Sequence, residues 1–326
     1  MRALVLREAT GPDGLRVEQV AEPTHDPSLV RIDVVAAGVT YPDLLTSQGR
    51  YQDRPDLPYV PGLEVAGIVR DAPADSTFRP GDRVAAACMG GGYAEVAVAD
   101  PSLVMGIPDG MPFVQASGLV LNYQTMFFAL HRRAALRSQE LVVVRGAGGG
   151  LGIAAIELSV AAGAEVLAVC RGAEKAALCR RAGAHHVVDE DEGELFRDAV
   201  ARVSGGIGAR LVVDPVGGDG TLDALRSLAP EGRLLVLGFT GGIPSIPANR
   251  LLLRNIAVIG AAWGAFLAVD PRIAEEARQR IEHLAASGAV RPPVHSVWPL
   301  ERGAEALIAL RDRSLVGKAA LTVATG

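Results

Sequence analysis

The residues whose types and spacing point most directly to chemistry lie in a glycine-rich loop. The short, wholly apolar run Leu141–Val144 leads into residues 146–152, which read GAGGGLG. Glycines in such a loop allow a tight turn, close approach of backbone N–H groups to a pyrophosphate, and close packing of the helix that follows. The loop therefore predicts dinucleotide binding. The alternative is a glycine-rich loop that only connects two packed elements. The predicted contacts come from Ala147, Gly149, Gly150, Leu151 and Gly152, with alanine where the usual pattern has its first glycine.

A second group of candidate residues indicates which cofactor binds. NAD-binding units place Asp or Glu about 20 residues past the glycines, where the carboxylate holds the ribose 2′-hydroxyl. Here that position holds Arg171, and Lys175 follows it. Both cations can pair with a 2′-phosphate. The sequence therefore favours NADPH, and the alternative is that both side chains are simply solvated at the start of a helix.

These residues need a framework of alternating strands and helices. A helix of about three turns is expected after the glycine loop, followed by a buried strand at Glu165–Val169. Four further buried strands are expected at residues 186–188, 211–214, 233–238 and 256–261. Six such strands predict a doubly wound parallel sheet of the Rossmann type between about residue 122 and residue 260. The acidic run at residues 189–194 is expected to form a solvated loop.

The remaining parts of the chain have a different pattern. Up to about residue 120, short strand-like runs such as Leu29–Ala36 and Glu64–Arg70 alternate with Pro and Gly turns, which is typical of a β-rich domain. After residue 270 we expect a helix at about 271–287, a helix within 299–313, and a last strand at 319–323.

The composition excludes several classes of protein. The net charge of −5 over 326 residues argues against nucleic-acid binding, and no apolar run is long enough to span a membrane. The N-terminus lacks the features of a signal peptide, so a cytoplasmic location is expected. Cys88, Cys170 and Cys179 follow no metal-binding or disulfide spacing.

The whole chain resembles the medium-chain dehydrogenase/reductase superfamily, specifically its zinc-free quinone oxidoreductase branch. The segments that carry this resemblance are AGVTYPDL at 37–44, PGLEVAG at 61–67, GDRV at 81–84, the glycine loop, DPVGG at 214–218, GR at 232–233 and GK at 317–318. The resemblance implies a GroES-like β-rich catalytic domain, residues 1–121 and 263–326, and a Rossmann dinucleotide-binding domain, residues 122–262. It also implies a homodimer that forms through the edge strand near residues 256–262.

The segments also show what this chain lacks. Zinc-dependent members carry Cys and His where this chain has Thr40 and Leu63. Neither side chain is a zinc ligand, so no metal site is expected. Without a Lewis acid the reaction suits an acceptor that is already activated toward hydride, such as a quinone or an α,β-unsaturated carbonyl compound.

The resemblance also implies roles for particular residues. Tyr51 matches a loop tyrosine that protonates the α-carbon in related enoyl-thioester reductases, and it can instead only line the pocket. Thr40 can position a carbonyl oxygen through its hydroxyl, or it can be a buried threonine satisfied by nearby backbone. The further residues that the resemblance assigns to the cofactor are Thr125, Val216, Gly238, Phe239, Ala262, Trp263 and Lys318.

The sequence thus predicts an NADPH-dependent, zinc-free oxidoreductase acting on small quinones or other activated carbonyl acceptors. One alternative is an enoyl-thioester reductase. An alternative of another class is a structural protein that binds NADPH with little turnover.

Overall fold

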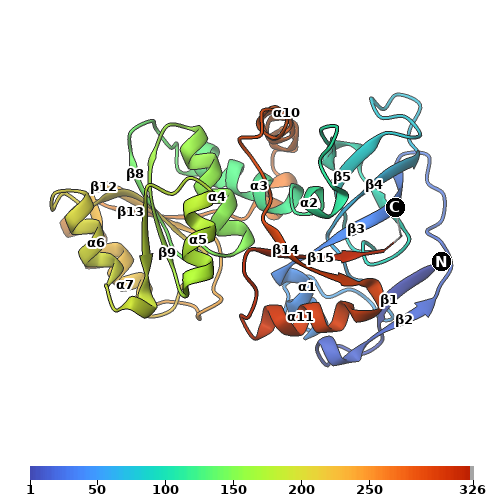
Figure 1. Cartoon of the computed structure of the whole chain (residues 1–326), viewed down its shortest axis with the longest axis horizontal. Coiled ribbons are helices and arrows are strands. Elements are labelled where there is room, and N and C mark those ends of the chain that lie inside the picture. Colours follow the sequence, from blue (N-terminus) through green and yellow to red (C-terminus); the bar gives the residue numbers. More distant parts are fainter. Residues whose placement is uncertain (324–326) are drawn as a thin grey trace. The chain divides into compact units, whose positions relative to one another are not determined.

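The computed structural model describes residues 1–323, which fold into two compact units (Figure 1). One unit comprises residues 1–121 and the C-terminal segment from Ala274, and the other comprises Asn122–Ile273. Residues 263–273, expected in the catalytic domain, lie in the second unit. The ring of Phe266 packs there on Phe128, with centroids 4.8 Å apart.

The second unit is built on a six-stranded, entirely parallel sheet within residues 122–273, all of which the structure describes. Its strand order, β10-β9-β8-β11-β12-β13, is the order of dinucleotide-binding folds. The strands are β8 (Leu141–Val144), β9 (Glu165–Cys170), β10 (His186–Asp189), β11 (Ala209–Asp214), β12 (Leu228–Val236) and β13 (Ala257–Gly260).

Helices cover both faces of this sheet, and Figure 1 shows α4 and α5 on one face with α6 and α7 on the other. This arrangement follows from right-handed crossovers that run in opposite directions from the central strand β8. The sheet core is aliphatic, because Val142, Val143 and Val144 are fully buried. The helices are α3 (Val120–Phe127) with its continuation η3 (Phe128–Arg133), α4 (Gly150–Ala161), α5 (Ala173–Arg181), η4 (Glu190–Glu192), α6 (Phe196–Val203), α7 (Gly220–Arg226), α8 (Ala248–Arg254) and α9 (Trp263–Leu267).

The first unit is β-rich. Within the described residues it contains a seven-stranded sheet of order β14-β15-β3-β4-β5-β7, with β6 also paired to β3, and a separate β1–β2 hairpin. The late strand β15 lies antiparallel to β3, with Ala320 opposite Gly38, so both ends of the chain build this sheet. The strands are β1 (Arg2–Leu6), β2 (Leu15–Gln19), β3 (Val30–Val39), β4 (Glu64–Asp71), β5 (Arg83–Ala87), β6 (Val96–Ala99), β7 (Val104–Gly106), β14 (Val294–Pro299) and β15 (Lys318–Thr322).

Few helices accompany this sheet. They are η1 (Pro12–Gly14), α1 (Tyr41–Ser47), η2 (Pro101–Leu103), α2 (Phe113–Ala116), α10 (Arg272–Ala286), η5 (Leu300–Arg302) and α11 (Gly303–Arg311). The expected fold class, a Rossmann unit beside a β-rich GroES-like unit, is confirmed.

Candidate functional site

The predicted cofactor residues of the second unit gather at one edge of its sheet. All six strands are parallel, so their carboxyl ends, and the loops that follow them, lie along the same edge. Residues 147–152 follow β8, Arg171 and Lys175 follow β9, Val216 follows β11, Gly238 and Phe239 follow β12, and Ala262 and Trp263 follow β13. Thr125 lies apart from these loops, on α3.

The glycine loop holds the N-terminus of α4 tightly against the end of β8. A Cβ atom added at Gly152 would lie 2.6 Å from both the Cα and the carbonyl oxygen of Ala147, so only glycine fits there. Gly146 adopts a left-handed φ of 59°, which makes the turn. The first turn of α4 has no acidic residue and no side-chain cap from Gly149. The backbone N–H groups at the start of α4 therefore fit a nucleotide pyrophosphate, whose oxygens accept hydrogen bonds from N–H groups at a helix N-terminus.

A buried ion pair shapes the neighbouring loop after β11. Arg145 Nη1 lies 2.6 Å from Asp214 Oδ2, and its guanidinium also donates to the carbonyl oxygen of Gly217. Asp214 Oδ1 in turn accepts the backbone N–H groups of Val216 and Gly217, at 3.0 and 2.9 Å. These bonds fix Val216 close to the glycine loop, since a Cβ at Gly146 would meet its side chain at 3.0 Å. The strands β8 and β11 flank the point where the strand order reverses, which is where such sheets bind ligands.

The two predicted phosphate-binding cations differ in their surroundings. Lys175 lies across the glycine loop, because a Cβ added at Gly148 would meet its aliphatic chain at 2.6–2.9 Å. The side chain of Arg171 is 73% exposed and forms an ion pair with Glu190, with Nε and Oε2 2.9 Å apart. The carboxylate of Glu190 raises the pKa of Arg171 through that hydrogen bond. The acidic run expected as a solvated loop thus contributes a partner to the candidate site.

The remaining predicted residues of this edge have mixed exposure. Phe239 is 46% exposed, and Trp263 is 6% exposed, with an indole N–H that has no hydrogen-bond partner among the described residues. A backbone bond from Gly241 N to Val216 O, 2.7 Å long, joins the loops after β12 and β11. No contact tests the cofactor roles predicted for these residues, which stay predictions.

In the first unit, Thr40 belongs to a buried hydrogen-bond network centred on Asp43. Thr40 caps α1: its Oγ1 accepts from Asp43 N at 3.3 Å and donates to Asp43 Oδ2 at 2.5 Å. Asp43 Oδ1 accepts from Gly62 N at 3.0 Å, and Oδ2 also accepts from the hydroxyl of Tyr93 at 3.0 Å. Both Thr40 hydroxyl functions are therefore used within the protein, as in the alternative reading of this residue.

Burial governs the ionisation of this network. It raises the pKa of Asp43 to about 6, although Thr40, Gly62, Tyr93 and Lys318 all favour the carboxylate. Burial, together with the charge of Asp43, also raises the pKa of Tyr93 well above its usual value. Asp43 therefore titrates close to neutral pH, while Tyr93 stays a hydrogen-bond donor.

Lys318, predicted to contact the cofactor, forms a buried ion pair with Glu64. Its side chain is 4% exposed, that of Glu64 is fully buried, and Lys318 Nζ also donates to Val39 O at 3.1 Å. The other oxygen of Glu64 accepts from Leu121 N, at 3.0 Å, in the first turn of α3. Lys318, Glu64 and Leu121 all belong to the first unit, and the pair therefore connects β4 and β15 within it.

Tyr51 lies after α1 and is partly buried. Its pKa is raised by burial first, and then by the charges of Asp53 and Asp43. The pKa of Tyr59 is raised to about 12, again by burial first and then by Asp43 and Cys88. Both phenols are thus protonated at neutral pH.

No group of three or more His, Cys, Asp or Glu side chains that can hold a metal ion occurs within residues 1–323. Thr40 and Leu63 occupy the positions discussed above, and Cys88 is a free, buried thiol. Burial, with the charges of Glu64 and Asp43, raises the pKa of Cys88 to about 12.

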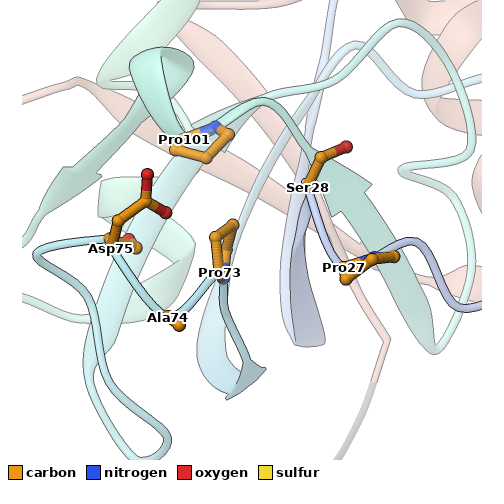
Figure 2. A pocket seen from close by; sticks show the side chains of 7 residues that line it. Pro27, Ser28, Pro73, Ala74, Asp75 and Pro101 are labelled. Carbon is orange, nitrogen blue, oxygen red and sulfur yellow. The ribbon is translucent and has the colours of Figure 1, made fainter.

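An open hollow of about 510 Å³ in the first unit contains none of the predicted site residues. Figure 2 shows the proline rings and Asp75 that border it. The lining residues are Pro27, Ser28, Pro73, Ala74, Asp75 and Ser76 from loops, and Pro101 at the start of η2. The candidate site therefore lies elsewhere.

Sequence reasoning assigned no role to several polar residues that shape the site. Asp43 had a signal in the Thr40-x-x-Asp43 spacing of a capping box, and Asp214 ends a predicted strand. Arg145 and Glu190 had none, since their partners lie far away in the chain.

Two protein families match consecutive parts of the chain. Residues 26–109 match the alcohol dehydrogenase GroES-like domain, and residues 150–283 match the family described as zinc-binding dehydrogenase.

Similar proteins cover almost the whole chain. Quinone oxidoreductase-like protein 2 of Rattus norvegicus is 36% identical over 325 residues, which are 99% of this chain and 92% of that protein. The crystal structure of a probable oxidoreductase from Mycobacterium abscessus has 41% identity and a TM-score of 0.90, with 99% of each chain covered. A mycobacterial protein solved in complex with NADPH has 28% identity and a TM-score of 0.89, covering 99% of this chain and 100% of that one.

Among residues 1–323, no helix is both long enough and apolar enough to cross a membrane.

Proposed function

Because the chain belongs to the medium-chain dehydrogenase/reductase superfamily, within its group of quinone oxidoreductase-like proteins, we propose that it is an NADPH-dependent, zinc-free reductase of quinones or other activated carbonyl acceptors. The observation that carries the proposal is the edge of the parallel sheet, where a glycine cradle and two cations lie together. A relative of the same fold has been solved with NADPH, which supports the choice of cofactor.

The proposed cofactor site divides into two parts. The N–H groups of Gly150, Leu151 and Gly152 would bind the pyrophosphate, and Arg171 and Lys175 would bind the 2′-phosphate. NADPH supplies the hydride when it is bound. The proposed roles of Thr125, Gly238, Phe239, Ala262 and Trp263 are to hold the nicotinamide end.

The choice of acceptor follows from the residues of the first unit. The positions of the zinc ligands hold Thr40 and Leu63, which offer neither thiolate nor imidazole. An acceptor that needs no Lewis acid therefore fits best, such as a quinone. The hydroxyl of Thr40 can hold a carbonyl oxygen only by turning away from Asp43.

Tyr51 favours one alternative acceptor. Its partly buried phenol is protonated at neutral pH, as a general acid must be, so an enoyl thioester is the second candidate substrate.

The test measures NADPH oxidation by purified protein with 1,4-benzoquinone and with crotonyl-CoA, alongside a binding titration. Oxidation with benzoquinone as the better acceptor supports the proposal, and a preference for crotonyl-CoA supports the alternative. NADPH binding without oxidation by either acceptor would contradict both and indicate a structural protein.

The expected homodimer and the cytoplasmic location stay predictions. The edge strand β13 pairs only with β12, within residues that the structure fully describes. Leu252 and Leu253 of the preceding helix α8 are 76% and 77% exposed. An open strand edge with apolar side chains beside it is the kind of surface that a second copy can cover.

A further inference from the structure

The strongest unassigned feature of the nucleotide edge is the ion pair between Arg171 and Glu190. Nε and Oε2 are 2.9 Å apart, and the carboxylate of Glu190 is the less exposed partner, at 33% against 73% for Arg171. Arg171 is the residue proposed for the 2′-phosphate, so its guanidinium already has an anionic partner.

The fold fixes Glu190 in this place. Strands β9 and β10 pair in parallel with Cys170 opposite Asp189, which brings the loops after both strands together. Asp189 is 8% exposed, and its Oδ1 accepts from Gly172 N at 2.8 Å and from Asp191 N at 3.1 Å. These two bonds join the loop of Arg171 to the turn that carries Glu190. The ion pair is therefore a consequence of strand register and backbone bonding.

We propose that Glu190 is a specificity-determining residue that sets how strongly the protein discriminates between NADPH and NADH. The inference rests on the proposed function. Glu190 competes with the 2′-phosphate for Arg171, and it offers an acceptor to a ribose 2′-hydroxyl. Both effects make the difference in affinity between NADPH and NADH smaller.

The competition is possible because the pair is exposed. Ion pairs of this kind contribute little free energy, and a phosphate can displace the carboxylate by accepting two parallel bonds from the guanidinium. Lys175 lies over Gly148 and keeps its own place on the glycine loop. When the 2′-phosphate takes the place of Glu190 on Arg171, the Glu190 carboxylate stays close to this dianion, and the repulsion between the two weakens NADPH binding.

The test compares dissociation constants for NADPH and NADH by titration of the whole protein. In Glu190→Gln, we expect the ratio of the NADH constant to the NADPH constant to rise about two- to fivefold, as fits the weakness of an exposed pair. The matched control is Glu192→Gln, which removes the same charge from an exposed neighbour with no recorded ion pair to Arg171. An unchanged ratio in Glu190→Gln, or an equal rise in Glu192→Gln, would overturn the inference.

A second background separates this inference from the proposed function. In Arg171→Ala, NADPH binding should weaken about tenfold, and adding Glu190→Gln should raise the ratio less than it does when Arg171 is present. A full effect of Glu190→Gln without Arg171 would overturn the competition. Wild-type protein that binds neither nucleotide would overturn the proposed function itself and this inference with it, whereas NADPH binding with an unchanged ratio sinks only the inference.

Discussion

Asp43 is a titratable carboxyl group that is almost completely shielded from water. It is 1% exposed, and its oxygens accept from two hydroxyls and from backbone N–H groups. These donors favour the carboxylate, but burial disfavours it more, and the pKa of Asp43 rises to about 6. The unfolded chain holds the same group at a pKa of about 3.9. Protonation of Asp43 therefore stabilises the folded state.

This difference predicts a pH dependence of stability. Between about pH 4 and pH 6 the folded protein binds a proton that the unfolded chain has lost, so this group makes stability fall as pH rises through that window. The contribution is on the order of 2–3 kcal/mol. Asp43→Asn should remove this contribution. The free energy of unfolding, measured in urea at pH 4.5 and pH 6.5, should then fall less between the two pH values than it does in the wild-type protein. Asp75→Asn, at an exposed carboxylate, is the control, and an equal change in both variants would contradict the assignment.

Tyr51 separates the two enzymatic candidates. A reduced quinone takes its proton on oxygen from water, whereas the enolate of a thioester needs a proton on carbon, for which a placed acid contributes about 10²–10⁴-fold. Tyr51→Phe keeps the ring and removes that proton. It should change kcat/KM for benzoquinone little and lower that for crotonyl-CoA at least tenfold, if crotonyl-CoA reacts.

The control for this prediction is Tyr41→Phe, at an exposed phenol in the first turn of α1. A large loss with benzoquinone would show that the Tyr51 hydroxyl acts in quinone reduction. An unchanged rate with crotonyl-CoA would exclude Tyr51 as an essential proton donor.

At the scale of elements, the sequence predicted those whose own pattern decides their structure. The run Leu141–Val144 forms β8 with the expected bounds, and the glycine loop leads into α4 as expected. The helix α1 escaped prediction because its seven residues lie in a β-rich region, although Thr40 and Asp43 form a capping box. Strand β12 begins at Leu228 rather than at the predicted Arg233. Glu231 has a φ of 60° and the pairing with β11 is irregular there, so residues 228–232 look like a turn in the sequence.

The site followed the same rule. Residues on successive strand ends come together because parallel strands share an edge, which sequence order alone predicts. The pairing of Arg171 with Glu190 depends on the register of β9 and β10, which no local pattern encodes.

The close packing of α4 on the glycine loop gives a prediction at this scale. In Gly152→Ala the new methyl group would meet Ala147 at 2.6 Å, so α4 must move away from the loop. Such overpacking costs about 1–3 kcal/mol, and NADPH affinity should fall at least tenfold as the N–H groups are displaced. The control is Gly260→Ala, since nothing lies within 4 Å of a Cβ there. Unchanged NADPH binding in Gly152→Ala would show that the pyrophosphate binds elsewhere.

For the molecule as a whole, the residues present predict activity without a metal. Within residues 1–323 no cluster of metal-binding side chains occurs, and a buried lysine and glutamate pair lies close to the position of Leu63. Prolonged dialysis against a chelator should leave NADPH oxidation unchanged, and elemental analysis should find no stoichiometric zinc. Loss of activity that added zinc restores would overturn the assignment to the zinc-free branch.

The ion pair between Glu64 and Lys318 joins two residues that the ribosome synthesises far apart in time. Glu64 and most of its sheet are synthesised early, but the strand that carries Lys318 follows about 200 residues after Leu121. At 5–20 residues per second the growing chain waits roughly 10–40 s for that strand. During this interval residues 36–39 of β3 lack the strand β15 and Glu64 lacks its cation, whereas the whole parallel sheet of the second unit is synthesised. The second unit can therefore fold while the first unit is still incomplete. In the nascent chain, the part of β3 that β15 covers stays without its partner strand until the end of synthesis.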